Sequence, residues 1–360
     1  MNELWLAGRG LACALGPDVG HAVAALRQGG VAPARFEVPG GFGWPYFALP
    51  AEDGDWLERT CRTVRRVARE SGALDTPRRG PLFVASSSID LGEREASGDF
   101  ERDFHAFAET LAETLDWQGP VFTVSTACTS AHNAVLSAGA WLRAGDAAEA
   151  LVLGIELANR LTVAGFGSMQ LLAPDAAQPL GASRRGLVLG EAVAALRLTS
   201  ARGTARWRVA GGANVVDGRD PAGAVPSAVE AMCREALQRS GLTAAQIGLV
   251  KLQAAGSPAN DASEIDGLRR VFGSGLPPLV SLKAAIGHTL GASGAAELAL
   301  LTACLETGAW PSSVHAHDPT LGARLAAQAP PDARYVLANI LGFGGGHAAL
   351  VLEDRGGAPA

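Results

Sequence analysis

Short apolar runs that fit buried strands alternate with helical patterns along the chain of 360 residues. In the first half the apolar runs are 81–88, 121–126 and 150–156, and segment 131–144 carries apolar side chains at helical spacing. Strands that are apolar throughout are buried on both faces, which requires helices on both sides of a sheet. The alternation therefore predicts an α/β fold.

The same order of elements recurs after about residue 205. The expected elements, in chain order, are helix 226–239, strand 249–256, helix 262–272, strand 278–284, helix 292–306 and two strands within 335–353 around a glycine turn. This recurrence indicates an internal duplication with its join near the polar stretch 199–207. We therefore expect an N-terminal half over 1–204 and a C-terminal half over 205–360.

Composition narrows the class of protein. Hydrophobic residues make up 48% of the chain and charged residues 18%, which predicts a large core, and the net charge of −6 argues against a nucleic-acid-binding protein. The five cysteines show neither a disulfide framework nor the Cys/His spacing of a metal site. Because neither a signal-peptide pattern nor an apolar stretch of membrane-spanning length is present, we expect a cytoplasmic protein without a membrane span.

Cys128 lies in FTVSTACTSAH (122–132), at the turn between an expected strand and an expected helix. A sulfur at a helix N-terminus meets free N–H groups and the positive end of the helix dipole, which stabilise a thiolate and lower the cysteine pKa. Small neighbours such as Thr126 leave room for a substrate. The alternative is a buried packing role, which is common for lone cysteines.

Two further segments carry candidate chemistry. SLKAAIGHTLGASGAAE (281–297) holds Lys283 and His288 at an expected strand end, followed by a glycine-rich helix start and Glu297. A histidine beside a thiolate can donate a hydrogen bond to a thioester oxygen or act as an acid or base, although capping or packing is the alternative role. Phe343 lies in a glycine turn that joins two strands rather than opening a helix, so a phosphate site is not indicated.

Several motifs, in the right order, resemble those of the β-ketoacyl synthases, the condensing enzymes of fatty-acid and polyketide synthesis. They are LAGRGLACALGPDVGHAVAALRQG (6–29), VSTACTSAHNA (124–134), RRGLVLGEAVAALRL (184–198), KAAIGHTLGASGAAE (283–297) and LGFGGGHAALVL (341–352). The resemblance covers nearly the whole chain. It implies a thiolase-like α/β fold, in which duplicated βαβαβαββ halves form a layered α/β/α/β/α sandwich, and a dimer formed across a sheet edge.

By this resemblance, Cys128 matches the acyl-accepting nucleophile and His288 the histidine of the Lys-His motif. Lys283 and Glu297 match the charged supports of that histidine, and Phe343 matches the phenylalanine that gates the acyl pocket. These assignments make Cys128, His288, Lys283 and Glu297 the expected catalytic residues.

The resemblance also implies the surroundings of the site and its partner. Thr126, Gly344 and Gly345 are expected beside the substrate, together with Phe343. No cofactor or metal is implied, because the acyl chain arrives on the phosphopantetheine arm of an acyl carrier protein. That carrier protein is therefore an expected partner.

The sequence departs from the family in KLQAAGSPANDASE (251–264). Ala255 stands where the family motif VxAHGTGTxxND has its second catalytic histidine, and two residues of the threonine-rich turn are missing. The family uses that histidine when malonyl-carrier protein is decarboxylated, and losing such a group typically costs on the order of a hundredfold or more in rate. His347, where the family has asparagine, is a conceivable substitute; an ordinary buried histidine is the alternative.

Two functions remain open. The first is a chain-length-factor-like partner subunit in a heterodimer with an intact ketosynthase, which Ala255 favours. The second is an active 3-oxoacyl synthase or acyltransferase that uses Cys128 and His288 as a homodimer, which the retained cysteine favours. Segment NRLTVAGFGSMQLLAP (159–174) resembles ketosynthases of aryl-polyene and xanthomonadin-type pigment clusters, so aryl-polyene chain elongation is the expected setting.

Overall fold

A computed structural model describes residues 3–356. Within this range ten strands form one mixed sheet: β1 (Trp5–Cys13), β4 (Leu82–Ala85), β5 (Val121–Val124), β6 (Glu149–Glu156), β8 (Ala192–Thr199), β9 (Trp207–Val216), β10 (Leu249–Lys251), β11 (Leu279–Val280), β12 (Tyr335–Leu341) and β13 (Gly346–Asp354). Across the sheet the order is β11-β10-β12-β13-β9-β1-β8-β6-β4-β5.

The sheet consists of two parts with the same topology. In the first part β5, β4 and β6 are parallel and β8 runs antiparallel between β6 and β1; in the second part β11, β10 and β12 are parallel and β13 runs antiparallel between β12 and β9. Within residues 3–356 the two parts join where β1 pairs with β9, at Trp5–Arg208 and Leu6–Trp207. The expected duplication is therefore present in the strand order.

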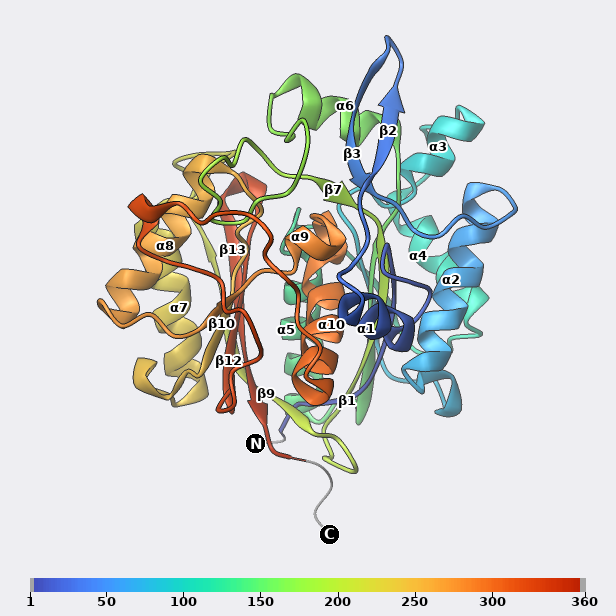
Figure 1. Ribbon diagram of the computed structural model, residues 1–360. Coiled ribbons are helices and arrows are strands. Elements are labelled where there is room, and N and C mark those ends of the chain that lie inside the picture. The colour runs from blue at the N-terminus through green and yellow to red at the C-terminus, as the bar shows by residue number, and fades with distance from the viewer. Residues whose placement is uncertain (1–2, 357–360) are drawn as a thin grey trace.

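Helices cover the sheet in layers (Figure 1). They include α1 (Val19–Arg27), α2 (Trp56–Glu70), α4 (Phe104–Thr114), α5 (Ser130–Ala144), α7 (Pro226–Ser240), α8 (Pro258–Phe272) and α10 (Ser293–Thr307). Helices α5 and α10 lie between the two parts of the sheet, whereas α2 and α4 cover the outer face of the first part and α7 and α8 that of the second. The result is the expected α/β/α/β/α sandwich.

The central layer is tightly packed. Every side chain of α10 from Ser293 to Cys304 is buried, because this helix has sheet on both sides. Gly154 on β6 faces α10 so closely that an added Cβ would lie 2.8 Å from the Cβ of Ala295. A second helix in the same layer, α5, places its N-terminus at the end of β5.

The remaining elements are smaller. They are a three-stranded sheet of β2 (Ala34–Val38), β3 (Phe42–Phe47) and β7 (Leu189–Gly190), the helices α3 (Leu91–Ser97), α6 (Arg160–Ser168) and α9 (Lys283–Ile286), and short 3₁₀ turns. The β2–β3 hairpin and α6 project from one end of the molecule (Figure 1). In the described part of the chain, no helix has the length and apolarity needed to span a membrane.

Four expected strands are shorter than the sequence indicates, and those expected at 81–88 and 121–126 cover only Leu82–Ala85 and Val121–Val124. The strand expected at 249–256 ends at Lys251. The Leu252 N–H still donates to Val280 of β11, but the N–H groups of residues 253–255 donate to carboxylates of α8 instead of to a neighbouring strand. The strand expected at 278–284 covers only Leu279–Val280, and Lys283 begins α9 rather than ending a strand. Helix α8 begins four residues earlier than expected, with Pro258 in its first turn, where proline is tolerated.

Candidate active site

The turn that carries Cys128 connects β5 to α5. Thr126 N–H donates to Ser130 Oγ at 2.9 Å, and Ser130 Oγ donates to the Ala127 carbonyl at 2.6 Å. Ala127 has a φ of 51°, a left-handed conformation that costs energy for a residue other than glycine and persists only where its surroundings enforce it. Cys128 therefore lies at a fixed position two residues before the helix, as the sequence predicts, with only 4% of its surface exposed.

The chemical state of this cysteine differs from the expected thiolate. Burial raises the pKa of the Cys128 thiol to about 11, although the Lys283 ammonium and the backbone N–H groups of Phe343 and Cys128 act in the opposite direction. The cost of removing the thiolate from water outweighs the stabilisation that was expected from its position at the helix N-terminus. At neutral pH the group is therefore a thiol.

His288 lies directly beside the sulfur. Its Nε2 is 3.1 Å from Cys128 Sγ, and its Nδ1 is 3.2 Å from Lys283 Nζ and 3.0 Å from Ser293 Oγ. An ammonium group can only donate, so Nδ1 accepts and the network assigns the proton to Nε2. Burial and then the charges of Lys283 and Lys251 hold the pKa of His288 well below its usual value. A neutral imidazole thus directs an N–H toward the sulfur.

Glu297 supports this histidine through two lysines. Its carboxylate pairs with Lys283 Nζ through one oxygen and with Lys251 Nζ, at 2.5 Å, through the other. Burial alone would raise the pKa of Glu297, but the two ammonium groups hold it below its usual value. All three side chains are fully buried. Sequence reasoning missed Lys251, whose signal was a lysine within the apolar run LVKLQ.

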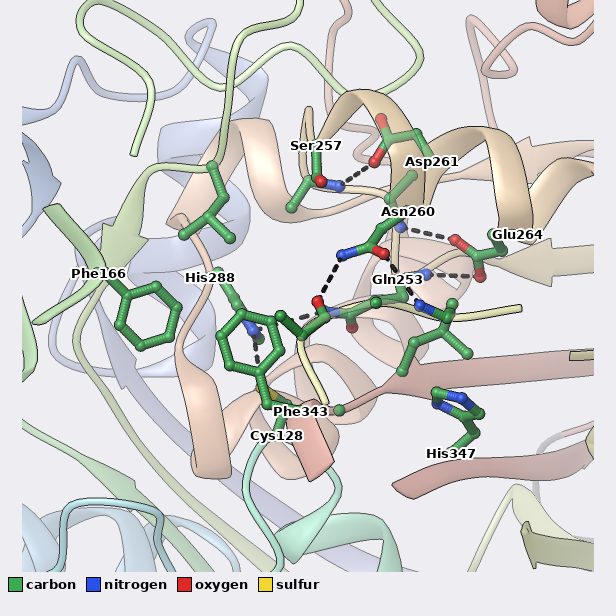
Figure 2. A pocket seen from close by; sticks show the side chains of 18 residues that line it. Cys128, Phe166, Gln253, Ser257, Asn260, Asp261, Glu264, His288, Phe343 and His347 are labelled. Carbon is green, nitrogen blue, oxygen red and sulfur yellow. Dashed lines mark hydrogen bonds between the residues drawn. The ribbon is translucent and has the colours of Figure 1, made fainter. Parts of the chain in front are cut away.

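The side chains of Cys128 and His288 face a cavity of about 30 Å³, roughly the space of one water molecule (Figure 2). Cys128 and His288 line it, as do Ala255 and His347. Phe343 also lines it and stacks on Phe166 of α6, with ring centroids 5.3 Å apart and planes at 13°. This aromatic pair, of which the sequence indicated only Phe343, covers one side of the cysteine.

Other expected substrate-site residues lie beside the cavity rather than in its wall. Thr126 is exposed, and its Oγ1 accepts a hydrogen bond from Asn133 at 2.8 Å. Gly344 has a φ of 78°, and at Gly345 an added Cβ would collide with the carbonyl oxygen of Asp217. These glycines therefore shape the turn that presents the Phe343 N–H.

The loop around Ala255 keeps a defined shape. The N–H groups of Gln253 and Ala254 donate to the Glu264 carboxylate at 2.9 and 2.8 Å, and that of Ala255 donates to Asp261 Oδ1 at 3.1 Å. Two carboxylates of α8 thus hold the backbone in place, and Ala255 presents only a methyl group to the cavity.

Two buried polar atoms at the cavity have no hydrogen-bond partner. They are Oε1 of Gln253 and Nδ1 of His347. Burial lowers the pKa of His347, so this ring is neutral near pH 7. The Gln253 amide nitrogen lies 3.4 Å from His288 Nε2, so exchanging the amide oxygen and nitrogen would give His288 N–H an acceptor.

The arrangement fits acyl transfer onto sulfur. Backbone N–H groups of Phe343 and Cys128 converge on the thiol, and donors placed in this way stabilise the oxyanion of a tetrahedral intermediate. The Nε2–H group of His288 is a third donor. In residues 3–356, no cluster of three or more His, Cys, Asp or Glu side chains is arranged to hold a metal ion.

Two family models match the chain. "Beta-ketoacyl synthase, N-terminal domain" matches residues 88–203, and "Beta-ketoacyl synthase, C-terminal domain" matches residues 208–317, so that together they cover more than half of the chain. The two matches follow one another in the order of the family.

Curated relatives include Nodulation protein E of Rhizobium sp. (strain N33), which is 29% identical over 262 residues; the match covers 70% of this chain and 59% of the relative. Nodulation protein E of Rhizobium meliloti is also 29% identical, over 69% of this chain and 65% of the relative. The chain thus matches about three-fifths of the length of these proteins. 3-Oxoacyl-[acyl-carrier-protein] synthase 2 of Vibrio harveyi is 27% identical over 85% of this chain and 79% of its own.

Solved structures share the whole fold. The ketosynthase (ApeO) in complex with its chain length factor (ApeC) from Xenorhabdus doucetiae aligns with a TM-score of 0.86 and 24% identity, over 98% of both chains. A β-ketoacyl synthase from Burkholderia phymatum STM815 aligns with a TM-score of 0.83 and 24% identity, over 99% of this chain and 100% of the other. The expected thiolase-like fold is thereby confirmed.

Proposed function

Because the chain belongs to the β-ketoacyl synthase family, we propose that it acts in fatty-acid or polyketide chain elongation as a chain-length-factor-like partner subunit. In this role it accepts an acyl chain on Cys128 but does not itself carry out decarboxylative condensation. The observation that carries the proposal is Ala255, a methyl group in the wall of the Cys128 cavity at the position of the family's second catalytic histidine.

The rest of the cavity wall supports the loss of condensation. Asp261 and Glu264 line it, and burial raises their pKa values to about 6 and about 7. Neither lysine nor arginine is among the lining residues. A malonyl carboxylate would therefore meet carboxyl groups and neutral imidazoles, with no cation to bind it. His347 also lines the cavity as a neutral ring whose Nδ1 has no partner, so it adds no cation there either.

The nucleophile itself is intact, which supports acylation. His288 Nε2 lies 3.1 Å from Cys128 Sγ, and Lys283 and Glu297 complete the support of the imidazole. In the transfer, the thiol sulfur attacks the carbonyl of an acyl thioester, the phosphopantetheine thiol leaves with the proton, and the oxyanion is held by the backbone N–H groups of Phe343 and Cys128.

The intact dyad also favours a second candidate, a homodimeric acyltransferase or 3-oxoacyl synthase. Such an enzyme would pass the acyl group from Cys128 to a second acceptor or condense it without help from position 255. The two candidates differ in whether the purified chain turns over alone.

Both candidates include partners. Structural neighbours are named as a ketosynthase with its chain length factor and as a type II polyketide synthase carrier protein with its ketosynthase. We propose an intact ketosynthase paralogue as the dimer partner and an acyl carrier protein as the acyl donor. The aryl-polyene setting is a narrower proposal, supported by the sequence of residues 159–174.

The test combines two measurements on the purified chain. Incubation with an acyl-carrier protein should add one acyl group, detected by intact-protein mass spectrometry, and Cys128→Ala should abolish the adduct, whereas Cys61→Ala should not. The same chain with acyl- and malonyl-carrier proteins should give no 3-oxoacyl product until a paralogue with a complete Cys-His-His set is co-purified with it. Robust turnover by the chain alone, lost in Cys128→Ala, would favour the second candidate.

A further inference from the structure

Lysine is nearly absent from this chain. Of its 30 basic residues, 28 are arginines, and the two lysines are Lys251 and Lys283. Both lysines are fully buried, and both pair with the carboxylate of Glu297. Cations at the surface are thus supplied by arginine, and the compact ammonium group is kept for one buried cluster, where a planar guanidinium would not occupy the same space.

Lys251 is not needed to neutralise Glu297. Lys283 already pairs with one carboxylate oxygen, and Lys251 adds a second cation on the other oxygen, at 2.5 Å. Two ammonium groups thus share one carboxylate, and Lys251 also interacts with the Glu264 carboxyl. Burial nevertheless lowers the pKa of Lys251, because taking a charge out of water is costly. The cost of burying this ammonium group calls for a contribution beyond neutralising Glu297.

The second cation is connected to the cysteine by an unbroken series of contacts. Lys251 reaches Glu297, Glu297 reaches Lys283, and Lys283 Nζ lies 3.2 Å from Nδ1 of His288. His288 Nε2 in turn lies 3.1 Å from Cys128 Sγ. Because Glu297 is shared, the charge of Lys283 is only partly compensated on the side that faces His288.

We propose that Lys251 is a positioning residue for the acyl-accepting site: by sharing Glu297 it leaves Lys283 with uncompensated positive charge, which keeps His288 neutral as a donor and favours negative charge on the Cys128 sulfur. The inference rests on the proposed acylation of Cys128, and it assigns to Lys251 the electrostatic support of that step.

The charged groups around this series act from several elements. Lys283 on α9 lowers the pKa of the Cys128 thiol, whereas Glu156 on β6 raises it. Lys251 and Lys283 both lower the pKa of His288. The Glu264 carboxyl of α8 interacts with Lys251, and that lysine also lowers the pKa of His132 on α5.

Two more groups lie nearby. His347 on β13 lines the same cavity and is neutral, with Asp217 acting on it. Asp261 of α8 lines the cavity as well, and Arg184 acts on that carboxyl. None of these groups replaces the cation that Lys251 contributes to Glu297.

The test measures alkylation of Cys128 by iodoacetamide, which needs no acyl substrate, by mass spectrometry between pH 6 and 10. We expect Lys251→Met to react about tenfold more slowly than the wild type at each pH below the thiol pKa, the effect of one pKa unit. The control is Arg94→Met, which removes another buried cation, paired with Asp90 at 2.5 Å on α3. It should react at the wild-type rate.

Equal rates for Lys251→Met and the wild type, with both folded by circular dichroism, would overturn the proposal. If Lys251→Met does not fold, the His288 ring is followed by NMR in the wild-type protein, with His288→Asn identifying its signals. The titration is compared with that of Lys251→Gln, which keeps a polar group beside Glu297. A higher His288 pKa in Lys251→Gln supports the proposal, and an unchanged pKa contradicts it. Absence of acylation in the wild type would remove the proposed function while leaving the alkylation comparison valid.

Discussion

Burial decides the protonation of the residues around Cys128. Burial raises the pKa of the thiol itself to about 11, and burial together with neighbouring ammonium groups keeps His288 neutral. Cys128 and His288 are thus held as an uncharged pair. In the acylation that we propose, the N–H groups of Phe343 and Cys128 lie where negative charge would develop.

Burial also sets the protonation of His132. It is fully buried on α5, its Nε2 lies 3.1 Å from the Ala338 carbonyl oxygen, and its Nδ1 has no partner. Burial lowers the pKa of His132 from 6.5 to about 3. A depressed folded-state pKa gives stability that is present above pH 6.5 and lost as the pH falls toward 3.

We therefore expect the wild type to lose about 2 kcal/mol more unfolding free energy than His132→Gln between pH 7 and pH 5, since only the wild type must protonate this ring on unfolding. The glutamine amide keeps a donor for Ala338. Urea unfolding of both proteins at the two pH values measures the difference, and parallel losses would contradict the assignment.

Glycines in the elements around the site differ in whether their surroundings leave space for a side chain. On β6, Gly154 meets α10 with no space for a side chain, whereas at Gly165 on α6 an added Cβ has nothing within 4 Å. Gly154→Val should therefore destabilise the protein by about 1–3 kcal/mol through overpacking. Gly165→Ala, the matched control, should be neutral or stabilise by up to about 1 kcal/mol. Thermal unfolding compares the two, and a tolerated Gly154→Val would show that α10 can shift.

Strand β5 gives the second prediction for an element. It is the last strand of the sheet, so one of its edges is unpaired. The carbonyl oxygens of Pro120 and Val124 accept hydrogen bonds from the N–H groups of Leu82 and Ser86, on and directly after β4. The backbone of Thr123 therefore faces the unpaired edge. The family dimer implied by the sequence uses such an edge. Thr123→Pro removes one edge N–H and should raise the dimer dissociation constant at least tenfold.

Analytical ultracentrifugation of the purified complex measures this change. Val216→Pro at the far end of β9, where the side chain is 76% exposed, is the control and should leave the dimer intact. Unchanged dimerisation of Thr123→Pro would place the interface away from β5.

At the scale of the whole molecule, the five-layer core leaves several cysteines without solvent. Burial raises the pKa values of Cys13 and Cys304 to about 12 and that of Cys128 to about 11, from 9.0. The stability from these thiols is complete below pH 9 and is lost as the pH rises toward 12, because the unfolded chain releases its protons first.

Burial also raises the pKa of Cys233, so the unfolding free energy should fall by about 5 kcal/mol between pH 8 and pH 10. Urea unfolding at both pH values measures the fall, and a Cys13→Ala/Cys304→Ala protein should lose about half as much. An equal loss in that variant would assign the alkaline effect to other groups.

The order of elements and the place of Cys128 could be predicted from the sequence. Apolar strands, helical spacing and a cysteine at a strand–helix turn are local patterns, and local geometry preserves them in the structure. The length of β10 could not be predicted, because carboxylates of α8 take the N–H groups that a longer strand would use.

The residue patterns predict an α/β fold, the position of Cys128 before α5 and the absence of a histidine side chain at Ala255, whereas the five-layer arrangement is implied by the resemblance to the family. Tertiary structure alone decided that Cys128 is a thiol and that Lys251 shares Glu297 with Lys283. The physical reason is that a pKa depends on burial and on charges from residues far away in the sequence. Those distances are fixed only when the two halves enclose α5 and α10.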